Sequence, residues 1–365
     1  KTKERKMTTV LEFRGSAHFR TRIICSLLSG RKIRIFDIRA QQEDLGLRDY
    51  EISFLRLVDK LTNGSTVVIN ETGTELNFRP GVLVGGRLSH ACPNSRCISY
   101  FLEAVMCIAP FTKTILQLTL TGVTNTLDDP AVDVLRNVHL SILKKFGIPD
   151  ETLEIKVQKR GAPPLGGGQV YFSCPFIREL VPIKLLEEGL IQRVRGIAYA
   201  TRVSPDHANR MVESSKKALK PFITNVFITT DLYKGAEAGL SPGYGIILVA
   251  ESTTGAQISV DTIASPGELP EDVAQRASKL LIEEIFKGGY VDSSSQFLPL
   301  LLMSLCPEDV SKIRIGALAP HTVGLLRHLK DFFGTKYKIV EDRESNTLVL
   351  SCLGSGYKNF NRKVW

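Results

Sequence analysis

The first feature of the sequence that could take part in phosphate chemistry is a glycine-rich segment. Residues 159–169 read KRGAPPLGGGQ, so two prolines brace a turn that leads into Gly166, Gly167 and Gly168. Because glycine has no Cβ, backbone of this kind can approach a phosphate or another chain very closely. A tight loop that lets two strands cross has the same composition. The motif alone leaves both interpretations open.

His321 is the second such feature, because it lies between Pro320 and Thr322 where a helix is expected to begin. A neutral imidazole held by a neighbour is a competent nucleophile for phosphorus, and backbone amides at a helix start favour phosphate. The alternative is a histidine at the start of a helix that Thr322 caps.

The helix expected over residues 322–333 also carries basic residues. Its apolar face is predicted from the spacing of four side chains: Val323, Leu326, Leu329 and Phe333. Arg327 and Lys330 lie opposite, with His328 nearby. This face is a candidate for RNA contact, and a solvated helix side is the alternative.

Charge and composition narrow the class of partner. The 365 residues carry a net charge of +9 with a pI near 9.1, which favours an anionic partner such as nucleic acid. The apolar run 297–305 is too short to cross a bilayer, and residues 1–6 lack the apolar core of a secretory signal. We therefore expect a soluble protein with no membrane partner.

The cysteines give no sign of a metal site or a disulfide framework. There are seven, with no CxxC pair, and most lie in apolar runs, so we expect reduced, buried thiols. His90, Cys92 and Cys97 match no common zinc spacing. We expect no metal.

A repeated pattern organises the chain. Apolar helical segments at 55–61, 140–146 and 325–333 are each expected to stop at a Gly or Asn-Gly C-cap and are followed by two strand-like segments. The first two copies lie about 85 residues apart and the third about 185 further on, which indicates an insertion of roughly 100 residues.

The insertion has an α/β pattern of its own. We expect strands at 192–200, 225–230 and 245–251, a helix at 205–219 and a loop at 235–245. These features divide the chain into a core domain over 1–182 with two units, an inserted domain over 183–270, and a third core unit over 271–365.

Several segments in the same order resemble the RNA 3'-terminal phosphate cyclase family. They include RGAPPLGGG from Arg160, IRA and GLR at 38–48, LTGVTN at 120–125 and PHT at 320–322. The resemblance covers nearly the whole chain. It implies an α/β (α+β) fold of three βαβαββ-like units, with a smaller α/β domain inserted before the third.

The same resemblance implies a reaction and also its loss. Family cyclases use ATP and a metal to adenylate a histidine, which corresponds to His321. Active members carry EGGGQ where this chain has FRGSA at 13–17, and an Asp-Gln pair where it has Phe297-Leu298. Tyr50 and Glu51 stand where Gln and His are usual. We therefore expect no catalytic residue, cofactor, metal or small-molecule substrate, with His321 a vestige.

The chain resembles most the non-catalytic, cyclase-like branch of that family. This resemblance implies a nucleolar assembly factor of the small-subunit processome that supports processing of the small-subunit rRNA precursor. The implied partners are a large nucleolar GTPase, processome proteins and pre-rRNA. Two alternatives remain: an active cyclase using His321 with ATP, and a pre-rRNA endonuclease using His321 or His328 with Lys330.

An anion pocket without turnover is the final expectation. Phe13 to Ala17 and Phe297-Leu298 are expected to face one pocket around His321. Arginines near the altered loop are its candidate anion and RNA ligands, since guanidinium binds phosphate with two parallel hydrogen bonds. They are Arg14, Arg20, Arg22, Arg39 and Arg48.

Overall fold

The computed structural model describes residues 10–359, so the charged segment 1–6 lies outside the described part. The first unit runs β1 (Leu11–Arg14), α1 (Phe19–Ser29), β2 (Ile33–Phe36), α2 (Asp49–Leu61), β4 (Thr66–Ile69) and β5 (Leu76–Arg79). Its sheet has the order β1-β2-β5-β4, in which only β1 and β2 are parallel. A short ribbon of β3 (Thr62–Asn63) and β6 (Val82–Leu83) follows α2.

The second unit repeats this plan. It contains β7 (Gly86–Ala91), α3 (Ile98–Ile108), β8 (Leu116–Gly122), α4 (Val132–Val134), α5 (Leu140–Lys145), β9 (Glu154–Lys159) and β10 (Gly168–Cys174). The sheet order β7-β8-β10-β9 matches the first unit, again with one parallel pair. A single-turn 3₁₀ helix (Ala109–Phe111) follows α3, and a π-helix (Leu135–His139) joins α4 to α5.

The third unit is split by the insertion. It consists of β11 (Lys184–Leu185), α8 (Phe297–Leu305), β16 (Val310–Ile315), α9 (Pro320–Phe333), β17 (Tyr337–Asp342) and β18 (Thr347–Leu353). Because β11 pairs in parallel with β16, the order β11-β16-β18-β17 repeats the same topology. The expected three-unit core is confirmed, but the insertion lies inside the third unit, after its first strand, and not before it.

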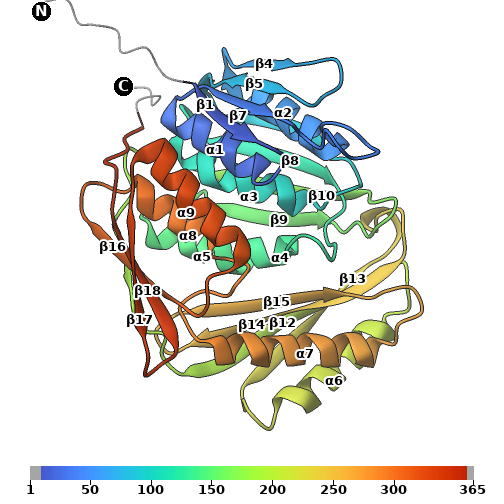
Figure 1. Cartoon of the computed structure of the whole chain (residues 1–365). Helices are drawn as coiled ribbons and strands as arrows, with labels where there is room; N and C mark the ends of the chain where they lie inside the picture. Colours follow the sequence, from blue (N-terminus) through green and yellow to red (C-terminus); the bar gives the residue numbers. More distant parts are fainter. Residues whose placement is uncertain (1–9, 360–365) are drawn as a thin grey trace, which may run out of the picture.

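The inserted part forms a separate sheet with two helices. It contains β12 (Ile191–Thr201), α6 (Asp206–Leu219), β13 (Val226–Tyr233), β14 (Gly243–Ser252), β15 (Gln257–Ile263) and α7 (Pro270–Lys287), in the sheet order β13-β12-β14-β15. A 3₁₀ turn (Gly235–Glu237) lies in the expected loop 235–245. Figure 1 shows α6 and α7 together on one side of this sheet and the core on the other.

Helix α7 corrects the expected end of the insertion at residue 270. Its buried side chains Val273, Ala277 and Leu281 belong to the small apolar cluster of the inserted sheet, separate from the main core. Since β11 belongs to the third core sheet, the start at 183 is also too early. We propose that the inserted domain spans 191–287.

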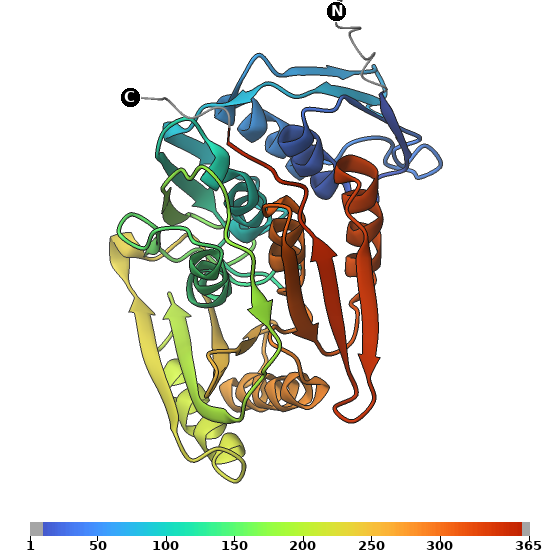
Figure 2. The same cartoon turned by 90° about the vertical axis from the view of Figure 1, so that its left-hand side faces the viewer.

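The helices of the three units meet in the centre and their sheets lie outside, as Figures 1 and 2 show. Helix α8 is at the heart of this arrangement, with every residue from Phe297 to Leu305 buried. It neighbours α3 and α9, while α1 neighbours α3 and α9. The beginnings of these helices are thereby held close together.

Glycine ends one of the three repeated helices as expected. Gly334 is the C-cap of α9 with φ of 73°, a left-handed conformation that favours glycine. Gly147, with φ of 86°, follows the C-cap residue Phe146 of α5. In the first unit the expectation was wrong, since Thr62 caps α2 and Gly64 lies in the turn before β4.

No helix within 10–359 is long and apolar enough to cross a membrane.

Candidate functional site

A cavity of about 430 Å³ lies where α1, α2, α3, α8 and α9 begin. His321, from the first turn of α9, lines it together with Ser16 and with Phe297 of α8. The structure therefore brings together Ser16 of the altered N-terminal loop, Phe297 of the altered third unit and His321, whereas Leu298 does not line the cavity. Helix beginnings that converge in this way normally attract anions, because their backbone amides lack partners.

The arginines of this cavity are already bound to carboxylates of the same chain. Arg39 makes two hydrogen bonds to Glu51, of 2.7 and 2.9 Å, and this hydrogen bonding raises the pKa of the guanidinium. The two other arginines of the cavity form equivalent ion pairs, Arg20 with Glu103 and Arg96 with Asp129. With Asp128, the cavity has four carboxylates for three arginines. It is not electropositive.

Two of these carboxylates also occupy helix beginnings. Glu51 accepts a 2.8 Å hydrogen bond from the backbone N–H of Arg48 at the start of α2. Asp129 accepts one of 3.2 Å from the backbone N–H of Cys97 at the start of α3. A phosphate bound at these helix starts would need the same amides and the same arginines. The chain's own carboxylates therefore fill the anion positions.

Phe13, which stands where active cyclases have a carboxylate, points away from the cavity. Its ring packs against His328 and Phe332 of α9, with centroids 5.2 and 5.6 Å away, and the Arg22 guanidinium lies 4.9 Å from its centroid. The expectation that Phe13 faces the cavity was wrong. The aromatic ring joins β1 to α9 in an apolar cluster instead.

Three of the five candidate arginines lie outside the cavity. Arg14 is exposed and pairs with Asp37 at 2.9 Å, and Arg48 pairs with Asp44 at 3.2 Å. Arg22 is only 6% exposed and donates to the carbonyl oxygens of residues 14 and 15, and burial lowers its pKa to about 10. Arg22 therefore serves the loop's structure and is not placed to bind RNA.

Arg96 is a member of the site that the sequence did not reveal. It precedes α3 and stacks on Tyr50 and Tyr100, with centroid distances of 5.1 and 4.7 Å. Its carboxylate partner Asp129 lies 33 residues away. Nothing local in the sequence marks that pairing.

His321 has no hydrogen-bond partner for its ring among residues 10–359. Its pKa is lowered because the surrounding protein replaces part of its water, an effect that Glu103 opposes. The expected cap was wrong: Thr322 is buried and its hydroxyl donates to Oε1 of Gln296 at 2.7 Å, while Ala319 is the N-cap residue. The imidazole is neutral at physiological pH but lacks the neighbour that would orient it as a nucleophile.

His328 is buried, so its assignment to an exposed basic face was wrong. The side chain is 7% exposed, and its ring lies edge-on to Phe13 and His18. Burial lowers its pKa to about 4, so the ring is neutral. The buried face of α9 also contains Leu325 and Phe332, whereas Val323, expected on the apolar face, is 40% exposed.

A family model described as RNA 3'-terminal phosphate cyclase matches residues 11–339. The chain belongs to this family. It is 50% identical to a probable RNA 3'-terminal phosphate cyclase-like protein of Dictyostelium discoideum, over 98% of this chain and all of that one. It is 46% identical to an RNA 3'-terminal phosphate cyclase-like protein of Homo sapiens, over 97% and 98% of the two chains. It is also 46% identical to the rRNA processing protein rcl1 of Schizosaccharomyces pombe, over 96% and 98%.

In the reaction that the family resemblance implies, ATP and a metal would have to bind among the residues of this cavity. Three of its carboxylates hold arginines, and residues 10–359 contain no cluster of three or more His, Cys, Asp or Glu side chains suited to a metal ion. His90, whose spacing to Cys92 and Cys97 matched no zinc site, instead lies 2.8 Å from the Ser53 hydroxyl. All seven cysteines are free and buried.

The glycine loop shared with the family is a structural joint in this chain. Leu240 N–H donates to Gly166 O at 2.8 Å, and a Cβ on Gly167 would lie 2.9 Å from the Leu240 side chain. A Cβ on Gly168 would lie 2.7 Å from the backbone nitrogen of Gly161. The inserted domain's own loop therefore closely approaches Gly166 and Gly167, while Gly168 is approached by the core segments around Gly161 and Gly122. Of the two original interpretations, the geometry favours the structural one.

Arg160 links the core to the inserted domain at the same joint. The sequence did not reveal this role. The side chain is fully buried and forms ion pairs with Asp133 of the core at 2.8 Å and with Asp231 of β13 at 2.9 Å. Burial alone would lower its pKa, but the two carboxylates raise it. Its guanidinium also lies 4.4 Å from the ring centroid of Tyr199.

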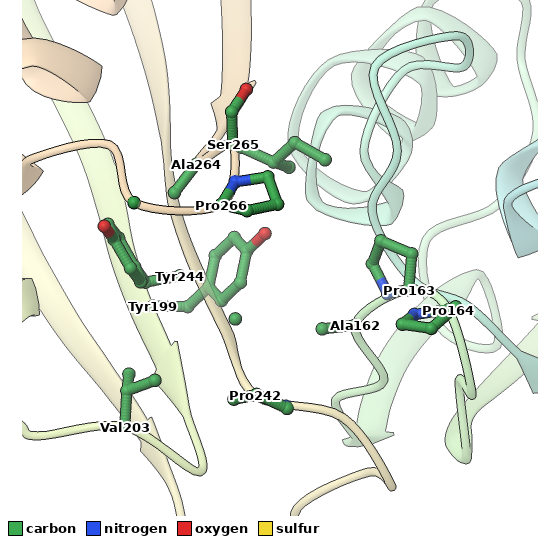
Figure 3. Close-up of a pocket in the computed structure, with 13 residues that line it drawn as sticks. Ala162, Pro163, Pro164, Tyr199, Val203, Pro242, Tyr244, Ala264, Ser265 and Pro266 are labelled. Carbon is green, nitrogen blue, oxygen red and sulfur yellow. The ribbon is translucent and has the colours of Figure 1, made fainter.

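An apolar cavity of about 520 Å³ opens beside this joint, between the turn at 162–164 and the inserted domain (Figure 3). Pro163 and Pro164 form one wall, and Tyr199, Tyr244 and Pro266 line the other (Figure 3). Within the described part of the chain, no charged side chain lines it. It is separate from the cavity around His321, since the two share no residue.

Proposed function

We propose that this chain is a non-catalytic factor that supports processing of the small-subunit rRNA precursor. One relative is named an rRNA processing protein and others are named cyclase-like. The observation that carries the proposal is the filled cavity: Glu51 and Asp129 hold both the arginines and the helix-start amides that a nucleotide would use. Removing one partner of such a buried pair costs about 3–5 kcal/mol. A nucleotide would therefore have to displace Glu51 and Asp129 from these arginines and amides in order to bind there.

The proposed setting is the nucleolus, with the small-subunit processome, a large GTPase of ribosome assembly and pre-rRNA as partners. The high net charge supports an RNA partner. Arg327 and Lys330 are exposed, form no ion pair within residues 10–359, and lie beside exposed Val323 and Ile339 in a shallow groove. We propose that these two cations contact the RNA or protein surface of the assembly.

The endonuclease alternative finds no support in this geometry. His328 is buried, and Lys330 follows His321 by nine residues on one helix. At 1.5 Å of rise per residue, the two lie about 13 Å apart along the axis. Neither His321 with Lys330 nor His328 with Lys330 therefore places two catalytic groups at one phosphodiester.

The proposal is tested by replacing the endogenous protein with a His321→Ala variant. Because we assign His321 no chemistry, processing of the small-subunit precursor, followed by RNA blotting, is expected to match that with the wild-type chain. A processing defect equal to depletion, at normal variant abundance, contradicts the proposal. Affinity purification of the wild-type chain is expected to recover a GTPase, processome proteins and pre-rRNA, and recovery of none of them contradicts the proposed setting.

A further inference from the structure

A groove of about 470 Å³ separates the inserted sheet from the core. One wall is formed by residues of β12, β13 and β14, on the face of the sheet away from α6 and α7, and the other by Arg136 and Asn137 of the π-helix. Figure 1 shows α6 and α7 on the opposite side of this sheet. π-helical turns within α-helices occur frequently at functional sites. This groove shares no residue with the cavity around His321.

An aromatic ring and a guanidinium lie side by side on the sheet wall. Phe227 of β13 is paired with Arg195 of β12, and Arg195 with Val249 of β14, so the three side chains form one row across the sheet. The Arg195 guanidinium is 5.7 Å from the Phe227 ring centroid. Phe227 is 57% exposed, and its strand is the edge of the sheet. The ring is therefore open to a flat partner.

The charges around this ring favour an anion. Arg136 faces it from the π-helix, and its nearest carboxylate, 3.9 Å away, is Asp133, which already holds Arg160. Among the described residues that line the groove, Glu251 is the one acidic side chain, and it is paired with Arg193. Within residues 10–359, Arg195 forms no ion pair and donates to Oδ1 of Asn225 at 3.1 Å, while Arg136 shares Asp133 with Arg160.

We propose that this groove binds a single-stranded segment of RNA, with a base stacked on Phe227 and phosphates contacted by Arg136 and Arg195. An exposed ring on a sheet, flanked by arginines, is the arrangement by which proteins bind unpaired bases. A duplex keeps its bases stacked inside and has no free face to offer the ring. The inference rests on the proposed function and deepens it by naming the site and the kind of RNA.

The test measures binding of a fluorescein-labelled single-stranded RNA 12-mer to the full chain by anisotropy. Phe227→Ala is expected to weaken binding roughly tenfold, the effect of losing one stacked base. Phe227→Trp is expected to retain it, whereas Phe227→Leu is expected to lose it, because stacking needs a π-face. Phe286→Ala is the matched control, since that phenylalanine is 81% exposed on α7, outside the groove.

The two arginines are tested by the salt dependence of RNA binding. For Arg136→Gln combined with Arg195→Gln, the magnitude of the negative slope of log affinity against log salt concentration is expected to decrease by about 1.4, because two phosphate contacts on a single strand are lost.

Wild-type-like affinity of Phe227→Ala at unchanged thermal stability overturns the inference and leaves the proposed function standing. Equal loss in Phe286→Ala also overturns it, as does competition by an acidic peptide but not by unlabelled RNA. If the wild-type chain binds no RNA, the RNA part of the proposed function fails as well.

Discussion

At the scale of residues, the arginines in the cavity around His321 are defined by the carboxylate partner that each already has. Loss of a carboxylate at Phe13 is visible in the sequence, but its consequence, an aromatic cluster with His328, is not. Glu51 shows the same point: it replaces a family histidine and then binds Arg39 and the start of α2. Residues that depart from the family's usual pattern thus make stabilising contacts of their own.

Glu51→Gln is expected to lower the free energy of unfolding by about 2–4 kcal/mol. It removes a carboxylate that is 2% exposed and leaves the Arg39 guanidinium without a counter-charge. Urea denaturation measures the change. In a double-mutant cycle with Arg39→Met, the loss is expected to be non-additive, and strict additivity contradicts the pairing.

His328 is expected to make stability depend on pH between about 4 and 6.5. Its pKa is near 4 in the folded chain and ordinary when unfolded, so the unfolded state binds more protons in this window. The contribution of neutral His328 is complete above pH 6.5 and is lost as the pH falls towards 4. His328→Phe is expected to flatten the unfolding free energy across this window by roughly 3 kcal/mol relative to wild type. If the unfolding free energies of wild type and His328→Phe run parallel across this pH window, the burial of His328 is contradicted.

At the scale of elements, periodicity in the sequence predicted most strands and helices, because each carries its own pattern. The two strands that close each core unit were predicted with their order, and β12, α6, β13 and β14 were found at nearly the predicted bounds. Periodicity does not predict which sheet a helix covers. Helix α7 shows an ordinary amphipathic pattern, and only the packing of Val273 and Leu281 shows that it covers the inserted sheet.

The contact between α1 and α9 supplies an element-scale prediction at Gly324. Helix propensity alone predicts that Gly324→Ala stabilises α9 by about 1 kcal/mol. A Cβ there would lie 2.1 Å from the His18 ring, however, so we expect a loss of about 1–3 kcal/mol. Differential scanning calorimetry measures it, and adding His18→Ala is expected to relieve the strain. A stabilised single variant contradicts the close approach of His18 to α9.

At the scale of the whole molecule, long-range pairing determines both the site and the joint between domains. Arg20 and Glu103 are 83 residues apart, and Arg160 and Asp231 are 71 apart, with no local signal linking them. The family resemblance predicted that Phe297 and His321 share a cavity, but not that its arginines are bound by carboxylates. The positions that depart from the family pattern were readable from sequence, whereas the contacts that their residues make were not.

Arg160→Met is expected to loosen the joint between the core and the inserted domain. It removes the nearer counter-charge of the fully buried Asp133 and leaves only Arg136, 3.9 Å away, so we expect a loss of about 3–5 kcal/mol. Hydrogen exchange is expected to speed up most in residues 235–245 and 161–168, which meet at this joint. Adding Asp133→Asn is expected to recover part of the stability, and exchange that stays as slow as in wild type contradicts the role of Arg160.

The central claim is that the cavity around His321 no longer supports adenylation. It is tested most directly by incubating the full chain with α-labelled ATP, magnesium and RNA bearing a 3'-phosphate, beside an active cyclase of the family and the His321→Ala variant. The filled cavity predicts no protein-bound label above that of His321→Ala, and no cyclic phosphate on the RNA. Label on the wild-type chain that disappears in His321→Ala would contradict the account.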